Sequence, residues 1–223
     1  MNTYTSHPLY NAVNDQRIQS LLPNFNGLCW RLAMDWLTVV PQTIMNFPFH
    51  YLEIGTLHGA NLVSVWKTYG NGAGENPNAA NATYTIIDPY FDYDEYHEYK
   101  GEQTTNFQTF QQNLRLSKMP ASQITFYRDV SSKVVPTLPD EKYHLIYIDG
   151  NHLPQSVLED AVLCWRKLAP MGILIFDDYG WGGPDVTQRG IDAFVAGYRD
   201  EFHKHYANNG QYFIQKSPTQ NTI

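Results

Sequence analysis

Short apolar runs alternate with amphipathic segments along most of the chain. Five of the runs predict strands, at Phe49–Ile54, Thr83–Ile87, Gln123–Tyr127, Tyr143–Ile148 and Ile173–Phe176. The segments between them predict helices near Asn61–Tyr69, Thr104–Ser117, Pro154–Leu168 and Thr187–Tyr198, with a short helix ending at Leu138. Strands that alternate with helices in this way are typical of a parallel, doubly wound α/β sheet.

Two aromatic runs near the C-terminus predict a hairpin, at Phe202–Tyr206 and Gln211–Gln215. The pair Asn209-Gly210 between them suits a tight hairpin turn. We therefore expect a Rossmann-like, doubly wound, mostly parallel seven-stranded sheet with a C-terminal antiparallel hairpin.

The first 45 residues predict a helical extension that precedes the sheet. Apolar residues recur every four positions over Gly27–Val40, which predicts an amphipathic helix that Pro41 ends, and a shorter helix is expected near Asp15–Leu22. Composition predicts loops at Gly70–Asn81 and Phe91–Lys100. We expect a single domain over residues 1–223, with the extension at 1–45 and the core at 46–216.

Charge and composition exclude several classes of function. The chain has 223 residues and a net charge of −7, which argues against nucleic acid or an anionic membrane as the main partner. No apolar run approaches the ~18 residues of a membrane span, and the N-terminus lacks the blocks of a signal peptide, so we expect a soluble, cytoplasmic protein. Cys29 and Cys164 lie in apolar helical patterns and imply neither a disulfide framework nor a zinc site.

Carboxylates follow two of the predicted strands. Asp149 ends one strand and is followed three residues later by His152, and the pair Asp177-Asp178 ends the next. Because ligands bind at the carboxyl ends of strands in open α/β sheets, these hard oxygen donors predict a Mg²⁺ site with a base beside it. The alternative is a set of solvated strand-end residues.

Three earlier strand ends carry groups that suit an adenosine. Glu53-x-Gly55-x-x-x-Gly59 lies at the first strand-to-helix turn, where glycines allow a tight bend and close approach of a ligand. Asp88 can accept hydrogen bonds from ribose hydroxyls, although Asp-Pro is also a common turn pair. Asp129 and Ser131 follow the third strand, on the adenine side.

At these positions the chain resembles the class I S-adenosylmethionine-dependent methyltransferases, from about Tyr51 onward. Glu53-Ile-Gly55-Thr-Leu-His-Gly59-Ala-Asn61 is similar to their first motif, and Ile124–Pro136 to their adenine-side segment. The pattern is that of the small metal-dependent O-methyltransferases. It resembles the macrolide sugar O-methyltransferases and, more distantly, the catechol and caffeoyl-CoA O-methyltransferases.

The resemblance implies S-adenosylmethionine as cofactor. Its predicted binding residues are Glu53, Gly55, Thr56, Gly59, Asn61, Asp88, Asp129, Ser131 and Asp149. Within this set, Asn61 matches the residue that holds the methionine carboxylate, Asp88 the ribose-binding acid and Ser131 the adenine-side residue. His58 lies inside the first motif and could touch the methionine moiety.

The resemblance also implies Mg²⁺, or another divalent cation such as Mn²⁺, held by Asp149, Asp177 and Asp178. Asp177-Asp178-Tyr179 replaces the usual Asp-Asn of the catechol and caffeoyl-CoA enzymes, and His152 replaces the lysine base of the catechol enzymes. Both replacements resemble the sugar-modifying enzymes. The predicted catalytic residues are therefore Asp149 and His152, with His152 as general base. A capping histidine or a metal ligand are the alternatives for His152.

The leading hypothesis is a metal-dependent O-methyltransferase acting on a hydroxyl of a sugar or glycan. Aromatic and acidic residues at Pro89–Lys100 and Tyr179–Asp185 suit a polyhydroxylated acceptor, or else only cover the core. A catechol-like phenolic acceptor and a non-catalytic S-adenosylmethionine-binding module are the alternatives. The expected partner is a small-molecule or glycan acceptor, and a homo-oligomer is compatible with the sequence.

Overall fold

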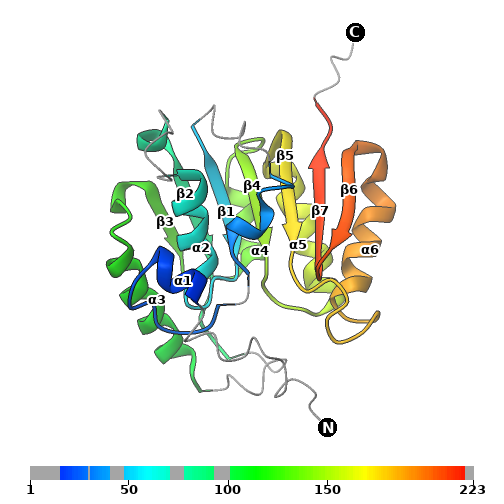
Figure 1. The fold of residues 1–223 in the computed structure, drawn as a ribbon. Coiled ribbons are helices and arrows are strands. Elements are labelled where there is room, and N and C mark those ends of the chain that lie inside the picture. The colour runs from blue at the N-terminus through cyan, green and yellow to red at the C-terminus, as the bar shows by residue number, and fades with distance from the viewer. Residues whose placement is uncertain (1–15, 30, 41–47, 71–77, 93–100, 219–223) are drawn as a thin grey trace. The chain divides into compact units, whose positions relative to one another are not determined.

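The computed structural model describes residues 16–29, 31–40, 48–70, 78–92 and 101–218 (Figure 1). The chain divides into two compact units. The first unit comprises Met1–Phe49, Thr56–Ala82 and Tyr90–Ile124, and the second comprises His50–Gly55, Thr83–Pro89 and Thr125–Ile223.

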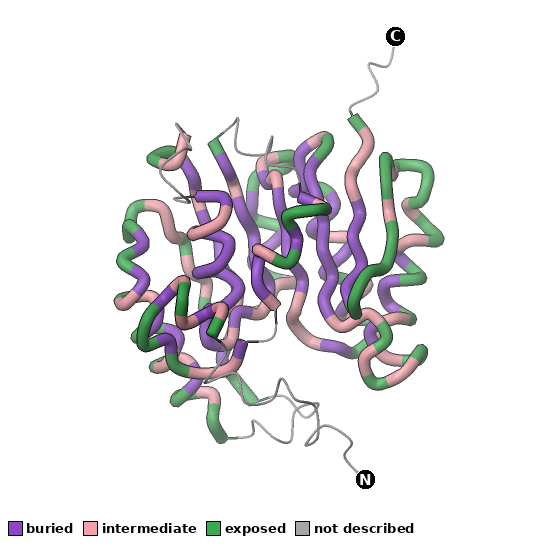
Figure 2. Tube along the Cα trace, in the orientation of Figure 1, coloured by how far each residue is buried: buried purple, intermediate pink, exposed green. Residues whose placement is uncertain are grey.

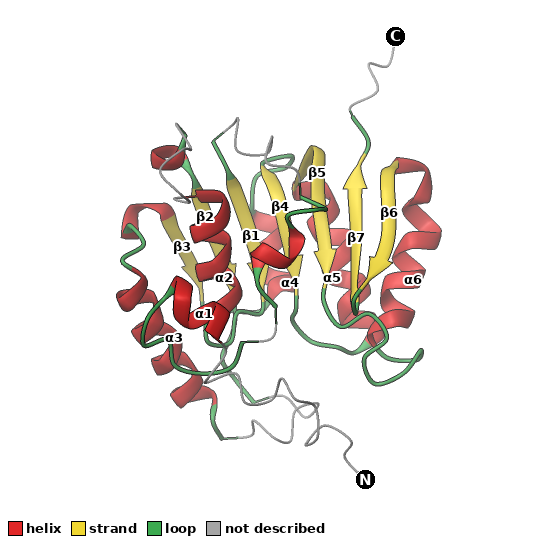
Figure 3. Ribbon diagram, in the orientation of Figure 1, coloured by secondary structure: helices red, strands yellow, loops and turns green. Residues whose placement is uncertain are grey.

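The second unit is built on a seven-stranded sheet. Its strands are β1 (His50–Ile54), β2 (Thr83–Ile87), β3 (Ile124–Tyr127), β4 (Tyr143–Ile148), β5 (Leu168–Phe176), β6 (Phe202–Asn208) and β7 (Gln211–Lys216). They lie in the order β3-β2-β1-β4-β5-β7-β6 (Figure 3). β1 pairs in parallel with β2 and β4, and β4 with β5, whereas β7 is antiparallel to both β5 and β6. The predicted Rossmann-like, mostly parallel sheet with an antiparallel hairpin is confirmed.

The C-terminal hairpin turns where the sequence predicts. Asn209 and Gly210 both have positive φ, of 49° and 75°. This is the backbone of the two-residue hairpin turn that matches the twist of the flanking strands. The turn returns the chain as β7, which pairs with β5.

Helices α4 (Ser131–Val134), α5 (Pro154–Lys167) and α6 (Thr187–Tyr198) belong to the same unit, with short turns at η9 (Val135–Thr137) and η10 (Arg199–Glu201). Their apolar faces and alternate strand residues, including Leu52, Ile146 and Leu174, form one buried core. Purple segments of the tube mark this burial along the central strands (Figure 2). In β1, and in β4 from Ile146 onward, the residues of this core occupy every second position, so the positions between them, such as Glu53 and Tyr147, point to the opposite face.

The first unit contains the remaining helical elements. They are α1 (Gln16–Leu21), η3 (Ala33–Trp36), α2 (Ala60–Val65), η5 (Trp66–Gly70), η6 (Ala79–Asn81), α3 (Gln103–Ser117) and η8 (Ala121–Gln123). Ile18, Phe25 and Val63 are part of its own buried core, against which Leu116 of α3 packs. None of the helices in the described parts of the chain is long and apolar enough to cross a membrane.

The predicted amphipathic helix over Gly27–Val40 is wrong. Among the described residues of this stretch, only Ala33–Trp36 is helical, as a single 3₁₀ turn. Gly27 has a φ of +110°, outside the helical range, and the backbone N–H of Leu28 donates to the Nδ1 atom of His58 at 3.0 Å. The four-residue spacing of apolar side chains reflects burial of an irregular segment. The expected loops at Gly70–Asn81 and Phe91–Lys100 lie largely outside the described residues.

Candidate active site

Backbone hydrogen bonds hold the carboxyl ends of five parallel strands in line. In each case the first residue after one strand donates its N–H to the last residue of the neighbouring strand. The four bonds, donor first, join Asp88 to Tyr127, Gly55 to Ile87, Asp149 to Ile54 and Asp177 to Ile148, at 2.8–3.1 Å. The strand-end residues that the sequence singled out in this unit therefore lie along one edge of the sheet.

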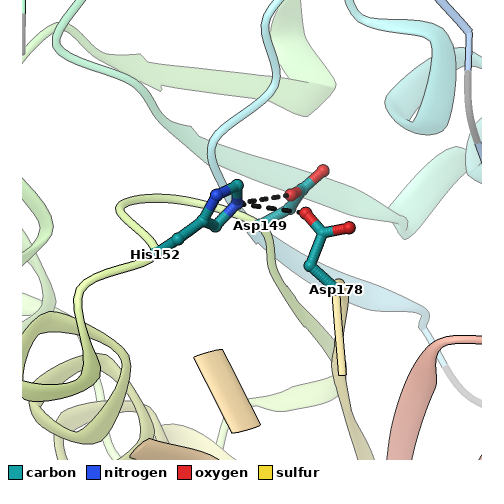
Figure 4. Close-up of side chains that lie close together, drawn as sticks. All are labelled: Asp149, His152 and Asp178. Atoms are coloured by element: carbon teal, nitrogen blue, oxygen red, sulfur yellow. Dashed lines mark ion pairs between the residues drawn. The ribbon is translucent and has the colours of Figure 1, made fainter. Parts of the chain in front are cut away.

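Two carboxylates and an imidazole come together at this edge (Figure 4). The Nε2 atom of His152 lies 3.1 Å from Oδ2 of Asp178 and 3.8 Å from Oδ1 of Asp149. One donor atom from each of these three residues lies within 4.8 Å of the other two, close enough for all three to surround one metal ion. His152 is buried, and the two aspartates are partly exposed.

The loop after β5 supports this cluster. Asp178 has a φ of +58°, a left-handed conformation that aspartate tolerates better than most residues. Its carbonyl oxygen accepts hydrogen bonds from the Thr187 hydroxyl at 2.5 Å and from the Trp181 N–H at 2.8 Å. The Trp181 ring lies 4.7 Å from the His152 ring, centroid to centroid. Residues at the start of α6 and in the loop therefore hold both Asp178 and His152.

Asp177, the third predicted metal ligand, is anchored separately. It is buried, and its Oδ2 accepts a hydrogen bond of 2.8 Å from the Tyr147 hydroxyl. Burial raises the pKa of Tyr147 well above its usual value, and the negative charges of Asp177 and Asp149 raise this pKa further. The edge of the sheet is thus strongly negative, which is the electrostatic environment that favours a bound cation.

Of the predicted cofactor residues in the second unit, Glu53 and Gly55 occupy the end of β1. Glu53 is fully buried, and its Oε2 accepts a hydrogen bond of 2.7 Å from the Tyr51 hydroxyl. Gly55 has a φ of +77°, and an added Cβ would lie 1.9 Å from the carbonyl oxygen of Asp149. Only glycine fits here, so the turn after β1 passes directly beside the Asp149 main chain.

Asp129 and Ser131 surround the start of α4. Asp129 is exposed, and its Oδ1 accepts bonds from the Val130 N–H at 2.8 Å and from Lys133 Nζ at 3.3 Å. The hydrogen bond from the Val130 N–H lowers the pKa of Asp129, and the hydrogen bond from Lys133 lowers this pKa further. The Ser131 hydroxyl donates to the buried carboxyl group of Asp160, whose pKa burial raises to about 7.

The other predicted cofactor residues, Thr56, Gly59 and Asn61, belong to the first unit. All three lie at the turn into α2, where the Gly59 N–H donates to the Thr56 carbonyl at 2.7 Å. Gly59 has a φ of +82°, and an added Cβ would lie 3.0 Å from the Phe110 ring. Thr56 and Asn61 are buried. The glycine-containing turn is therefore tightly packed against α3.

His58, in the same turn, bonds with both ring nitrogens inside the first unit. Nδ1 accepts from the Leu28 N–H, so Nε2 carries the proton and donates to Asn106 Oδ1 at 3.1 Å. Burial lowers the pKa of His58, which favours this neutral form. Its observed partners are thus protein groups, and it ties the segment around Leu28 to α3.

The sequence interpretation missed Tyr51, Tyr147 and Asp160. Both tyrosines precede an assigned acidic residue by two positions, so strand alternation places them on the same face as Glu53 and Asp149. That spacing was the available signal. Asp160 lies within an apolar helical pattern, where nothing but its charge distinguishes it.

Comparison with known proteins adds an independent line of evidence. A family model described as "Methyltransferase domain" matches residues 52–179, more than half of the chain. No curated protein matches the sequence.

Solved structures share the fold at low sequence identity. A putative caffeoyl-CoA O-methyltransferase from Staphylococcus aureus is 15% identical, with a TM-score of 0.60 over 96% of this chain and 94% of that one. The O-methyltransferase NovP is 16% identical, with a TM-score of 0.58 over 79% and 77% of the two chains.

MycE, from the mycinamycin biosynthetic pathway, was crystallised with Mg and SAH. It is 13% identical, with a TM-score of 0.56 over 93% of this chain and 55% of MycE. The family match and the shared architecture agree: the chain belongs to the methyltransferase-domain family and has the class I S-adenosylmethionine-dependent methyltransferase fold.

Proposed function

We propose that the protein is a divalent-metal-dependent O-methyltransferase that transfers a methyl group from S-adenosylmethionine to a hydroxyl of a sugar or glycan. One observation carries the proposal. In a methyltransferase fold, the carboxylates of Asp149 and Asp178 and the imidazole of His152 meet at the ends of adjacent strands β4 and β5. This combination provides hard oxygen ligands and a proton acceptor side by side.

The donor set fits a hard cation. Asp149 and Asp178, with Asp177 from the same turn, would hold Mg²⁺ or Mn²⁺ through carboxylate oxygens, which these ions prefer. When bound, the cation supplies Lewis-acid chemistry that lowers the pKa of an acceptor hydroxyl and orients it. The carboxylates of Asp149 and Asp178 lie close together, and a bound cation would offset the repulsion between them. The Mg in MycE crystals is consistent with this assignment.

The cofactor assignment rests on the strand ends. Asp88 would accept hydrogen bonds from the ribose hydroxyls, and Ser131, with Asp129, would lie at the adenine side. Glu53, Gly55, Thr56, Gly59 and Asn61 form the motif at the first strand-to-helix turn. The residue types present, with glycine required at Gly55 and Gly59, fit S-adenosylmethionine.

His152 is the proposed general base, which takes the proton from the acceptor hydroxyl. Its Nε2 atom lies 3.1 Å from Oδ2 of Asp178 and 3.8 Å from Oδ1 of Asp149, so these two carboxylates orient the imidazole. Trp181 packs beside the imidazole and limits its movement. S-adenosylmethionine, when bound, would supply the methyl group, and the protein's own residues would orient the acceptor hydroxyl and remove its proton.

A sugar or glycan acceptor is favoured by the surroundings of the base. Trp181 presents an aromatic ring beside His152, and aromatic rings stack well on the apolar faces of sugars. The Asp177-Asp178-Tyr179 sequence and the histidine base are also the forms that resemble sugar-modifying methyltransferases.

The test is methyl transfer from isotopically labelled S-adenosylmethionine to a panel of sugars, nucleotide sugars, glycans and catechols. We expect transfer to a sugar hydroxyl that EDTA abolishes and added Mg²⁺ or Mn²⁺ restores. Activity that survives EDTA would refute the metal mechanism. Transfer only to catechols would refute the acceptor class while leaving the chemistry in place.

A second measurement separates a base from a ligand at His152. In His152→Gln, a base role predicts a methyl-transfer rate at least about 100-fold lower with nearly unchanged Mn²⁺ affinity. A ligand role predicts weaker Mn²⁺ binding. Asp178→Asn is the matched comparison, because it removes a proposed ligand charge and should weaken Mn²⁺ binding directly.

A further inference from the structure

A buried tyrosine lies directly beneath the acidic edge. Tyr147 of β4 is 1% exposed, and its hydroxyl donates to Oδ2 of Asp177 at 2.8 Å. In the sheet, Tyr147 pairs with Ile175 of β5, two residues before Asp177. Residues two apart share a face, so the tyrosine side chain reaches diagonally along that face to the carboxylate.

This hydrogen bond fixes the direction of the Asp177 carboxylate. The ionised carboxylate carries no hydrogen of its own, so the Tyr147 hydroxyl is the donor and Oδ2 of Asp177 the acceptor. A bond from a neutral hydroxyl to an ionised carboxylate is among the stronger hydrogen bonds of a protein interior. With Oδ2 held from within the sheet, the carboxylate plane of Asp177 is set before any ligand arrives.

A second pair of the same kind lies on the neighbouring strand. Tyr51 of β1 donates to Oε2 of Glu53 at 2.7 Å, and all of these side chains are buried. Glu53 pairs with Tyr147 across β1 and β4, so the two tyrosine–carboxylate pairs share one face. They lie at different strand ends. Glu53 precedes the turn at Gly55, whereas Asp177 directly precedes Asp178, a member of the cluster with Asp149 and His152.

We infer that Tyr147 is a positioning residue for the divalent cation, because its hydrogen bond orients Asp177 so that this carboxylate joins Asp149 and Asp178 as a ligand. The inference rests on the proposed metal-dependent function. Outer partners of metal ligands commonly account for 10- to 100-fold of metal affinity. Tyr147 acts through Asp177 and does not itself touch the cation or the reacting atoms.

The experiment measures Mn²⁺ affinity of the full chain by electron paramagnetic resonance of free Mn²⁺. It compares the wild type with Tyr147→Phe, Tyr51→Phe, Asp177→Ala and the double variant Tyr147→Phe/Asp177→Ala. Phenylalanine removes only the hydroxyl, so the buried ring remains. We expect about tenfold weaker Mn²⁺ binding for Tyr147→Phe, near wild-type affinity for Tyr51→Phe, and no further loss when Tyr147→Phe is added to Asp177→Ala.

The outcomes separate the inference from the function on which it rests. If the wild type binds no Mn²⁺, the metal site itself is refuted and the inference with it. If the wild type binds Mn²⁺ but Tyr147→Phe binds equally well, only the inference fails. Equal losses in Tyr51→Phe and Tyr147→Phe, or additive losses in the double variant, would reveal a general effect of buried hydroxyls and would also overturn it.

Wild-type Mn²⁺ affinity in Asp177→Ala overturns the inference whether or not Tyr147→Phe folds. Far-ultraviolet circular dichroism of each variant identifies any that fail to fold.

Discussion

Asp160, which bonds to Ser131, allows a quantitative test of how burial raises the pKa of a carboxyl group in this fold. The residue lies on α5, is 4% exposed, and accepts a hydrogen bond from the Ser131 hydroxyl. Burial is the largest influence on this carboxyl, and it raises the pKa from 3.8 to about 7. The substitution Asp160→Asn removes the charge while keeping the size of the side chain and an oxygen that can accept the serine hydroxyl.

The sign of the effect follows from proton binding. Because the folded pKa lies above the unfolded pKa, the native state binds more protons between pH 4 and 7, and the free energy of unfolding falls as pH rises through this range. The stabilisation is complete below the unfolded pKa and is lost above the folded one. With about 1.36 kcal/mol per pKa unit, the shift corresponds to about 4 kcal/mol in total, of which about 2.5 kcal/mol falls between pH 5 and 8.

Urea unfolding followed by circular dichroism at pH 5 and pH 8 measures this difference. We expect the stability of Asp160→Asn relative to the wild type to increase by about 2.5 kcal/mol from pH 5 to pH 8. Glu159→Gln removes the adjacent exposed carboxylate and serves as the control, with no comparable change. A difference for Asp160→Asn that is constant with pH would refute the assignment of a buried, raised carboxyl at this position.

Two further predictions concern the packing that positions the site. Gly55→Ala places a Cβ against the Asp149 carbonyl in a left-handed backbone, and we expect a loss of about 2–5 kcal/mol in urea unfolding. Gly183→Ala, at φ +101° with no atom within 4 Å of the added Cβ, isolates the backbone strain and should cost only about 1–2 kcal/mol, so equal losses would contradict the clash. Phe194→Ala empties the centre of an aromatic cluster with Trp165 and Tyr198, and should cost about 3–5 kcal/mol. A loss no greater than that of Val195→Ala, on the partly exposed side of α6, would show that this cluster does not stabilise the unit.

The strands and long helices of the second unit could be predicted because each has its own periodic pattern. β2, β4 and α6 begin and end at the predicted residues. β5 begins at Leu168, five residues before the predicted Ile173, because Pro170 and Gly172 resemble a loop in sequence. The backbone extends through these residues despite a φ of +61° at Met171. Here pairing with neighbouring strands outweighs local preference.

The helix predicted over Gly27–Val40 is wrong because the conformation of this segment depends on a contact with a residue that is distant in the sequence. Leu28 and His58 are 30 residues apart in sequence, and the hydrogen bond between them holds the backbone at Leu28 against the His58 ring. Gly27 then adopts a positive φ, with the His58 ring packed where a Cβ would be. A periodic run of apolar residues therefore indicates burial and leaves open which backbone conformation achieves it.

For the site, the rule of strand carboxyl ends predicts that Asp149 and Asp178 are neighbours, and the structure brings them together around His152. The rule gives no information on side-chain direction. Whether His152 faces Asp178, and whether Asp177 bonds to Tyr147, depends on the positive φ of Asp178 and on the sheet register. The hydrogen-bonding role of Tyr147 could not be predicted either, because this residue lies in an apolar strand where a tyrosine is expected simply to pack.

The line of backbone bonds across the strand ends has a consequence for folding. β1 and β4, which lie side by side, carry His50 and His144, 94 residues apart in the chain. Strand pairs that are so far apart in sequence form slowly, because the chain loses the entropy of closing a large loop before the contacts between the strands stabilise it. The turn after β1 passes beside the Asp149 main chain, so this contact forms only when β1 has paired with β4. A chain that is still folding therefore lacks the close approach of Gly55 to Asp149, which forms only in the native sheet.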